Sequence, residues 1–341
     1  MTASTIHDVA ELAGTSIATV SRALNEPAKV RPSTRERILA AVETLSFRPN
    51  LLGRQLRSER THLIGVVLPD VFNPVFGECM QGIEESAAAS GYRVLLMTTR
   101  YDASREAYAI DTLLSQRVDG LILTVAEAAS HPVLSQLACS GVPYQLVYNH
   151  SATHPCVSVD NRQAARDGVR LLVAQGHRRV LMLTGNRAAS DRAAQRYLGY
   201  CDALKEAGLV PETPLEVDFN DRTLPRPILD RLVDPLSRPT ALFCGNDLLA
   251  LVVMRALRVV GMRVPDEISI VGFDGLAIGE LLTPPLATVC QPNREIGSAA
   301  WRHLQGVLDG GPPSSSILPH RIRADGTVAP FPLHPPTEHL S

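Results

Sequence analysis

The sequence predicts a small all-α helix-turn-helix domain followed by an α/β core of two doubly wound parallel-sheet lobes. Three observations carry this prediction. The first 60 residues show short helical patterns and no strand pattern, whereas short apolar runs alternate with longer helical stretches from Leu63 onward. Buried apolar strands that alternate with helices are typical of parallel sheets covered on both faces. The apolar runs form two series separated by a break near Asp160, which favours two sheets over one large sheet.

The composition is that of an ordinary folded protein with an uneven distribution of charge. The 341 residues are 45% hydrophobic and 20% charged, which excludes disorder as the main state, and the length suits two or three domains. An evenly spread net charge of −2 would argue against a nucleic-acid partner. However, residues 1–60 hold nine Lys and Arg against six Asp and Glu, whereas the remainder holds 24 against 29.

Several other classes of protein are not supported. No run of about 18 apolar residues is present, so we expect no membrane span. The first residues lack the basic and apolar regions of a secretory signal, so we expect none. The six cysteines are widely spaced without a C-x-x-C pair, which is poor spacing for zinc or for a disulfide framework. We therefore expect reduced cysteines in a cytoplasmic protein, with no metal ion and no cofactor.

Residues 1–46 are expected to form the helix-turn-helix domain. Apolar residues recur at helical spacing before and after a break at Gly14, and a third amphipathic pattern ends near Ser46. A hydroxyl precedes a carboxylate by three residues at Thr5–Asp8 and again at Ser33–Glu36. This spacing is that of a capping box, which marks the start of a helix.

The second helix of this domain has the pattern of a recognition helix. Ser16 is placed to cap it, and Val20 and Leu24 face the first helix. Four residues then point outward, where such a helix meets base edges: Ile17, Ala18, Ser21 and Arg22. Arg22 suits either two-donor recognition of guanine or a phosphate contact. The spacing alone leaves open a three-helix bundle whose outer face is only solvated.

Residues 47–61 are expected to form a hinge helix or linker. The stretch from Phe47 to Arg57 alternates basic and apolar side chains and has too little apolar surface to fold alone. Pairing with a second copy on DNA would stabilise it. Leu56, between Arg54 and Arg57, suits an apolar wedge in a minor groove with phosphate contacts beside it. An interdomain linker with solvated basic residues is the alternative.

The core is expected to span residues 62–327. Seven apolar runs predict its strands, and they begin at Leu63, Tyr92, Asp119, Pro143, Val180, Ala241 and Ile268. Five helical stretches end at a glycine suited to a left-handed cap, namely Gly91, Gly141, Gly176, Gly208 and Gly261. Trp301 lies in a late helical stretch and is expected in the core. Residues 328–341 lose periodicity and are expected to form a flexible tail.

Several motifs resemble those of the lactose-repressor (LacI/GalR) family. The run T-I-x-D-V-A-x-x-A-G-x-S-x-x-T-V-S-R-x-L-N begins at Thr5, and an R-P-N element follows at Arg48. Further matches are V-D-G-L-I-L at Val118, G-H-R at Gly176, F-C-G-N-D at Phe243 and V-G-F-D at Val271. The resemblance covers most of the chain. It implies a core like that of periplasmic binding proteins, in a homodimeric, effector-controlled repressor that binds a pseudo-palindromic operator in double-stranded DNA.

The resemblance also implies which residues contact DNA. Carried over by position, these are Thr5, Ser16, Ile17, Ala18, Thr19, Ser21, Arg22, Asn25, Asn50, Arg54 and Leu56. Positions 17 and 18 are those at which the family varies to choose its operator. Ile17 and Ala18 can touch thymine methyl groups but donate no hydrogen bonds to bases, so they do not define an operator sequence.

A cleft between the two lobes is the expected effector site, because ligands of doubly wound sheets bind beyond the carboxyl ends of the strands. The expected effector-binding residues are Asp70, Phe72, Asn73, Phe76, Arg192, Arg196, Phe219, Asn246, Asp247 and Asp274. Of these, the resemblance implies ligand contact by Arg196 and Phe219. Asn73 before Pro74 suits a helix cap equally well. Asp160 and Gln291 lie near the expected lobe crossings, where a hinge role is equally supported.

Carboxylates combined with aromatic side chains suit a polyhydroxylated ligand such as a sugar. Arg100, Arg192 and Arg196 would favour a sugar acid or a sugar phosphate if they share the cleft. We expect release from DNA by such a ligand; a purine or other metabolite that acts as a corepressor is the alternative. A free-standing solute-binding protein would have no use for residues 1–60. An enzyme is disfavoured, because no glycine-rich phosphate-binding motif is present.

Overall fold

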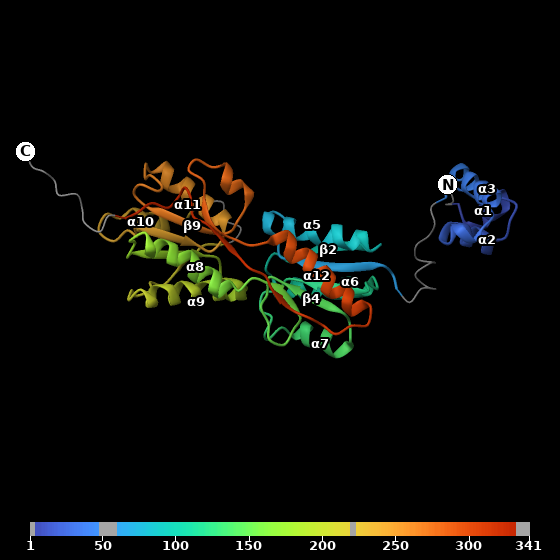
Figure 1. Cartoon of the computed structure of the whole chain (residues 1–341), viewed down its shortest axis with the longest axis horizontal. Coiled ribbons are helices and arrows are strands. Elements are labelled where there is room, and N and C mark those ends of the chain that lie inside the picture. Colours follow the sequence, from blue (N-terminus) through green and yellow to red (C-terminus); the bar gives the residue numbers. More distant parts are fainter. Residues whose placement is uncertain (1–3, 48–59, 219–222, 332–341) are drawn as a thin grey trace, which may run out of the picture. The chain divides into compact units, whose positions relative to one another are not determined.

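The computed structural model describes residues 4–47, 60–218 and 223–331. The chain divides into two compact units, Met1–Thr61 and His62–Ser341 (Figure 1). Each unit has a hydrophobic core of its own.

The N-terminal unit consists of short helices, as the sequence predicts. They are α1 (Ile6–Leu12), α2 (Ile17–Asn25), the 3-10 turn η1 (Pro27–Lys29) and α3 (Pro32–Thr44). The capping box at the start of α1 is confirmed: the Asp8 backbone N–H donates to Thr5 Oγ1 at 3.4 Å, and the Thr5 N–H donates to the Asp8 carboxylate at 2.7 Å. Ser16 caps α2 by accepting a hydrogen bond from the Thr19 N–H at 3.2 Å.

The predicted capping box at Ser33–Glu36 is wrong. Helix α3 begins at Pro32, so Ser33 already lies inside the first turn, and Arg31 occupies the cap position without a side-chain hydrogen bond. Proline is favoured at the first helical position because its fixed φ matches the helix and its missing N–H is not needed there. The start of α3 is therefore indicated by Pro32 and not by the hydroxyl of Ser33.

The core of the N-terminal unit joins all its α-helices. Val9 from α1, Val20 from α2 and Ile38 from α3 are fully buried at its centre, and Leu24 packs against them. The predicted contact of Val20 and Leu24 with the first helix therefore holds. This packing leaves the opposite side of α2 exposed.

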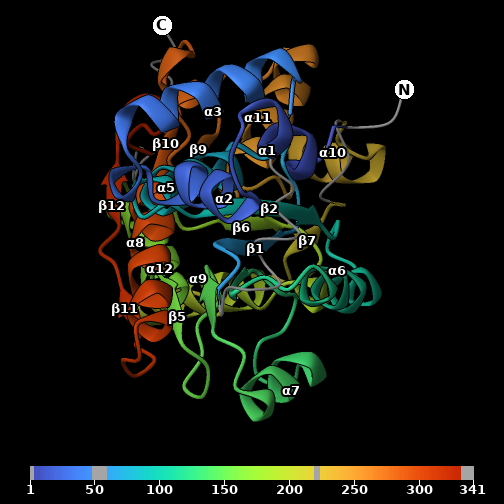
Figure 2. The ribbon, with the colours of Figure 1, turned by 90° about the vertical axis from the view of Figure 1, so that its right-hand side faces the viewer.

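The first lobe of the second unit is built on a parallel sheet with the strand order β11-β5-β4-β3-β1-β2. The strands are β1 (Leu63–Leu68), β2 (Arg93–Thr98), β3 (Gly120–Leu123), β4 (Tyr144–Val147), β5 (Cys156–Ser158) and β11 (Ser316–Ile317). The helices are α5 (Pro74–Ala89), α6 (Ala103–Ser115), α7 (Pro132–Ser140) and α12 (Asn293–Leu308). Helices α5 and α12 cover one face, and α6 and α7 cover the other. Figure 2 shows α12 and α6 on opposite sides of this sheet.

The second lobe repeats this plan, with the strand order β12-β10-β9-β8-β6-β7. Its strands are β6 (Val180–Thr184), β7 (Leu215–Glu216), β8 (Ala241–Cys244), β9 (Ser269–Asp274), β10 (Ala287–Cys290) and β12 (Arg321–Arg323). Only β12 runs antiparallel to its neighbour among these paired strands. Its helices are α8 (Asn161–Ala174), α9 (Asp191–Glu206), α10 (Arg226–Val233) and α11 (Asp247–Val259), with 3-10 turns η2 (Arg187–Ala189) and η3 (Ala277–Leu281).

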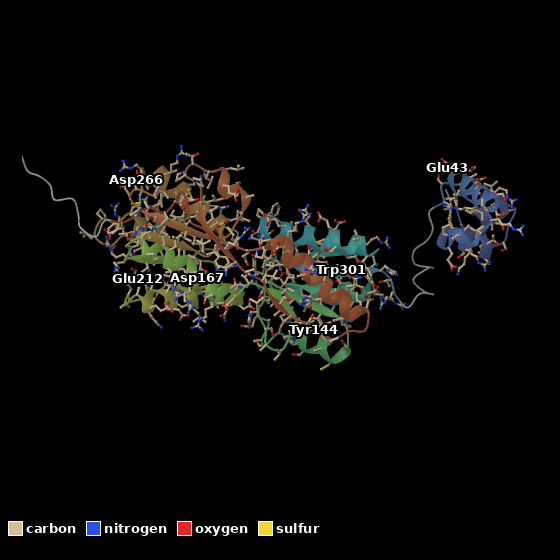
Figure 3. All side chains as sticks on the ribbon, in the orientation of Figure 1. Glu43, Tyr144, Asp167, Glu212, Asp266 and Trp301 are labelled. Carbon is tan, nitrogen blue, oxygen red and sulfur yellow. The ribbon has the colours of Figure 1, made fainter. Side chains whose placement is uncertain are left out.

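Most of the predicted core elements are present. All seven apolar runs are strands, and the five predicted cap glycines have φ angles between +69° and +90°. Trp301 is buried in α12, with its ring 4.9 Å from that of Tyr92, so its predicted core position is confirmed (Figure 3). The short strands β5, β7, β10, β11 and β12 were not predicted.

The two lobes exchange segments. Among the described residues, the chain passes from one lobe to the other before α8, between β10 and α12, and between β11 and β12. Asp160 and Gln291 lie at the first two of these crossings, as expected. The third crossing returns the chain to the second lobe.

The first four residues of the expected flexible tail, residues 328–331, contact the second lobe. Val328 packs against the core, the Ala329 N–H donates to Ser269 Oγ at 3.1 Å, and the Phe331 N–H donates to the Gln175 carbonyl at 2.8 Å. Residues 328–331 are therefore held on the second lobe by hydrogen bonds that a periodicity argument does not detect. The rest of the expected tail, residues 332–341, lies outside the described residues.

Candidate functional site

The outer face of α2 carries the predicted base-reading side chains. Ile17, Ala18 and Arg22 are exposed, whereas Thr19 and Ser21 are half-buried. Thr5 and Ser16 are exposed, and their hydroxyls cap the starts of α1 and α2. Asn25 ends α2. The predicted contacts at Asn50, Arg54 and Leu56 lie outside the described residues.

A pocket lies between the lobes of the second unit, and we call it the interlobe pocket. The space between its side chains, including the part open to solvent, is about 480 Å³. Its lining residues are Asn73, Val75, Phe76, Tyr101, Tyr148, Thr184, Gly185, Ser190, Arg192, Ala193, Arg196, Gly245, Asn246, Asp274 and Gln291. They follow the carboxyl ends of strands from both sheets, including β1, β2, β6 and β8. This is the edge at which parallel sheets bind ligands.

Six of the predicted effector-binding residues line this pocket: Asn73, Phe76, Arg192, Arg196, Asn246 and Asp274. Two of them also cap helices. The Asn73 Oδ1 accepts from the Val75 N–H at 3.1 Å at the start of α5, and the Asn246 Oδ1 accepts from the Leu249 N–H at 2.7 Å at the start of α11. Both roles considered for Asn73 are therefore compatible.

Three other predicted residues, Asp70, Phe72 and Asp247, do not line the pocket. Phe72 is 79% exposed, and Asp70 accepts a hydrogen bond from the Phe72 N–H at 2.8 Å within the loop before α5. Asp247 is fully buried, where it accepts from the Leu276 N–H at 2.7 Å and from Thr288 Oγ1 at 2.6 Å. Burial raises the pKa of Asp247 to about 6. It holds the loop after β9 in place and does not face a ligand. Phe219 lies outside the described residues.

Arg196 and Asp274 form an ion pair in the wall of the pocket. The Arg196 guanidinium lies 3.6 Å from the Asp274 carboxylate, donates to Asn161 Oδ1 at 2.9 Å and to the Gly245 carbonyl at 2.6 Å, and stacks on the Phe273 ring. Burial raises the pKa of Asp274, and the neighbouring Arg196 opposes this shift. Both side chains are thus fixed in place, with hydrogen-bonding groups of opposite kind beside the cavity.

Arg192 connects the two lobes beside the pocket. Its Nη1 donates to the Val125 carbonyl of the first lobe at 2.9 Å and lies 3.1 Å from the Asp191 carboxylate. Arg100, which could have joined this cationic group, is exposed and does not line the pocket. The expected cluster of three arginines is therefore reduced to Arg192 and Arg196.

Five polar lining residues were not among the predicted ligand contacts, namely Tyr101, Tyr148, Thr184, Ser190 and Gln291. Tyr101 follows β2 and Tyr148 follows β4, so the carboxyl-end rule applied to every predicted strand would have found them. Burial raises the pKa of Tyr101 to about 12, so its phenol is neutral. Gln291 donates from Nε2 to Asp274 Oδ1 at 2.9 Å. It follows β10, a strand too short to have been predicted, and the sequence supports a hinge role for it as well as a place in the pocket.

A helix-turn-helix unit joined to a two-lobed α/β unit with a pocket between its lobes defines the class of DNA-binding regulators with a ligand-binding domain. Residues 5–50 match the model of bacterial regulatory proteins of the lacI family. Residues 61–323 match the model of periplasmic binding proteins and the sugar binding domain of the LacI family. The chain belongs to the LacI family.

Relatives over nearly the whole chain are regulators. Catabolite control protein A of Priestia megaterium is 35% identical over 93% of this chain and 97% of its own length. The HTH-type transcriptional repressor CytR of Escherichia coli strain K12 is 33% identical over 91% of each chain. A crystal structure of the Lac repressor dimer bound to operator and the anti-inducer ONPF matches with a TM-score of 0.85 and 29% identity, over 96% of this chain and 100% of that one. The family is therefore one of transcriptional regulators and not of enzymes.

Three further features of the described residues concern membrane-spanning helices, metal-binding clusters and disulfide bonds. No described helix is both long and apolar enough to cross a membrane. No group of three or more His, Cys, Asp or Glu residues in the described ranges could hold a metal ion. All six cysteines, which lie within these ranges, are free thiols.

Proposed function

We propose that the chain is a cytoplasmic repressor that binds a pseudo-palindromic operator as a homodimer and is released by a sugar or sugar acid. The observation that carries this proposal is the interlobe pocket, whose wall contains the Arg196–Asp274 ion pair. Fixed donors and acceptors beside Phe76 and Tyr101 suit a small hydroxylated ligand. The purine-responsive corepressor remains the second candidate, since the same aromatic side chains would also stack on a planar ring.

The proposed DNA contact is made by α2 in a major groove. Its exposed Ile17 and Ala18 would contact thymine methyl groups, and Arg22 would contact a guanine or a phosphate. The hinge segment that contains Asn50, Arg54 and Leu56 would bind the adjacent minor groove. Phosphate contacts release counterions, so operator affinity should fall steeply with salt concentration.

A homodimer is supported by exposed apolar side chains in both lobes of the second unit. In the first lobe they are Val71, Phe72, Leu96 and Tyr108, and in the second lobe Val259, Val260, Ile278 and Leu281. Leu96 lies on β2, which is an edge strand of its sheet. An exposed strand edge with apolar side chains favours association with another chain. A second copy of this chain would bury that apolar surface.

The proposed switch is closure of the lobes around the ligand. Contacts across the lobes lie beside the pocket: Asn149 Nδ2 donates to the Asp191 carboxylate at 2.7 Å, and the Asp191 N–H donates to the Ala126 carbonyl at 2.8 Å. A ligand that touches both lobes stabilises this closed arrangement. If the operator prefers the other arrangement, ligand and DNA weaken each other's binding by the same factor.

A thermal-shift screen of the full chain tests the ligand class. The compounds are sugars, sugar acids, their phosphates and purines, because a ligand that binds only the folded state raises the melting temperature. A hit should then lower the affinity for operator DNA selected by the chain itself from random sequences. Arg196→Ala should abolish the thermal shift of that hit. A shift that survives in this variant would overturn the assignment of the pocket.

The same purified protein tests DNA binding. Fluorescence anisotropy with the selected operator, at several salt concentrations, should give a linear fall of log affinity with log salt. An affinity that does not depend on salt would contradict the proposed DNA contact. A hit that strengthens operator binding would replace release by corepression.

A further inference from the structure

Two polar atoms on the wall of the interlobe pocket have no partner among the residues that the structure describes. They are Nη2 of Arg192, a donor, and Oε1 of Gln291, an acceptor. Arg192 is only 6% exposed and Gln291 only 7% exposed. A buried polar group without a hydrogen bond costs free energy, so such groups in a binding pocket mark where a ligand supplies the missing partner.

The Arg192 guanidinium is held in its orientation by hydrogen bonds, so its Nη2 cannot reach a different acceptor by rotation of the side chain. Its Nη1 is held by the Val125 carbonyl at 2.9 Å and by the Asp191 carboxylate at 3.1 Å. The residue lies in the first turn of α9, whose backbone N–H groups and dipole also favour a negative charge. One Nη therefore joins the lobes, while the other, on a side chain that lines the pocket, has no partner among the described residues.

Each of the two guanidinium groups that line the pocket lies beside one carboxyl group. The nearby carboxyl groups are Asp191, which contacts Arg192, and Asp274, which contacts Arg196. Burial raises the pKa of both carboxyl groups, which favours their neutral forms. An acidic group on the ligand would give the unpartnered Nη2 of Arg192 a charge-assisted hydrogen bond.

We infer that the effector carries an acidic group, a carboxylate or a phosphate, that binds Nη2 of Arg192, and hydroxyl groups that bind Gln291 and Asp274. This inference rests on the proposed function and narrows its ligand class. Arg192 is then the residue that makes the affinity for an acidic ligand higher than the affinity for its neutral parent sugar. Because the same guanidinium holds the first lobe through Val125, binding of the acid also stabilises the closed lobes.

Matched compounds test this assignment by calorimetric titration of the full chain. The series are glucose, gluconate and glucose 6-phosphate; galactose, galacturonate and galactose 1-phosphate; and ribose, ribonate and ribose 5-phosphate. At least one acid should bind at least about 10-fold more tightly than its neutral parent. The carboxylate and phosphate members of a series show which acidic group fits.

Substitutions then test whether Arg192 makes the difference. Arg192→Gln should weaken binding of the acid by about 10-fold or more beyond any loss in the binding of its neutral parent, because only the acid uses the free Nη2. Arg192→Lys, which keeps the charge, should recover part of this loss and provides a second variant if the glutamine variant folds poorly. Arg187→Gln is the matched control, because Arg187 lies just before the same helix but outside the pocket.

The outcomes separate this inference from the proposed function. Binding of a neutral sugar without preference for its acid would overturn the role of Arg192 and leave the proposed sugar site standing. Equal losses in Arg192→Gln and Arg187→Gln would also overturn it, because the effect would then be general electrostatics. If no compound of any series binds, both the inference and the proposed sugar-type ligand fail.

Discussion

His177 is buried beneath the C-terminal segment of the second lobe. Its Nδ1 lies 3.1 Å from Thr240 Oγ1, and its Nε2 lies 3.0 Å from Ser269 Oγ and 3.1 Å from the Ala329 carbonyl. Burial lowers the pKa of His177 below its ordinary value of 6.5. The folded protein therefore holds this imidazole in its neutral form.

This lowered pKa predicts a loss of stability in acid. Above the unfolded pKa of about 6.5 both states are neutral, so the interaction contributes fully. As the pH falls through 6.5 toward the lower folded pKa, the unfolded state takes up the proton first and is favoured. The melting temperature of the wild type should fall more between pH 7.5 and pH 5 than that of His177→Gln, by a few degrees. His150→Gln, at an exposed position, should follow the wild type, and parallel curves for all three proteins would contradict the prediction.

At the level of residues, the pocket is only partly predictable from the sequence. Asn73, Arg192 and Asp274 could be found because each lies at the end of a recognisable apolar strand or in the segment that follows it. Asp247 follows such a strand as well, but its carboxylate turns to the Leu276 N–H and to Thr288. The direction of a side chain at a strand end depends on tertiary hydrogen bonds, which a single sequence does not display.

At the level of elements, close helix crossings define each lobe. In the first lobe, α5 and α12 approach so closely that a Cβ on Gly297 would lie 2.0 Å from the Cys79 carbonyl oxygen, and one on Gly82 would lie 2.1 Å from the Arg294 carbonyl oxygen. In the second lobe, a Cβ on Gly199 of α9 would lie 2.1 Å from the Arg162 carbonyl oxygen of α8. These glycines are needed for lack of space and not for an unusual φ.

Gly297→Ala should therefore destabilise the protein even though alanine is the better helix former. Separating two backbones costs about 2 kcal/mol or more, which exceeds the roughly 1 kcal/mol gained in helix propensity. Gly306→Ala in the same helix is the control, because no described atom lies within 4 Å of its added Cβ. Chemical denaturation should show a lower midpoint for the first variant and an equal or higher midpoint for the second. Equal midpoints for the two variants would contradict the prediction, because they would show that α5 and α12 can move apart to accommodate the methyl group at little cost in stability.

The elements themselves were predictable where apolar runs were long. Strands such as β1 and β9 sit inside their sheets and read as unbroken apolar stretches. Strand β12 reads Arg-Ile-Arg and β7 reads Leu-Glu, so neither shows periodicity, and both are recognised only by the neighbours with which they pair. Edge strands of this kind are stabilised by pairing with a neighbouring strand, and their own sequences do not predict them.

At the level of the whole molecule, the proposed homodimer can be tested with charge. Leu96→Lys and Leu281→Lys place a charge at positions that are 39% and 84% exposed, one in each lobe. Each should shift the chain toward a monomer, because a partner would have to desolvate the ammonium group. Operator affinity should fall by about 100-fold or more, since two linked half-site contacts become one.

Light scattering after size-exclusion chromatography gives the mass of each variant. Leu236→Lys is the control, because Leu236 is 90% exposed in the loop after α10, outside the apolar sets assigned to the interface. A dimeric mass for Leu96→Lys and Leu281→Lys, with unchanged operator affinity, would place the interface elsewhere.

The three crossings between the lobes determine when each lobe can be completed during synthesis. The first lobe takes its strands β1 to β5 from the early part of the chain, but α12 and β11 come from residues 293–317. Trp301 and Leu304, which fill one side of its core, therefore leave the ribosome after nearly all of the second lobe. While the second lobe is being synthesised, one apolar face of the first lobe's sheet lacks α12 and is exposed. We therefore expect chaperones to bind the nascent chain at this stage. Neither lobe can be expressed as one uninterrupted segment; a minimal ligand-binding fragment has to begin near residue 62 and continue through Phe331.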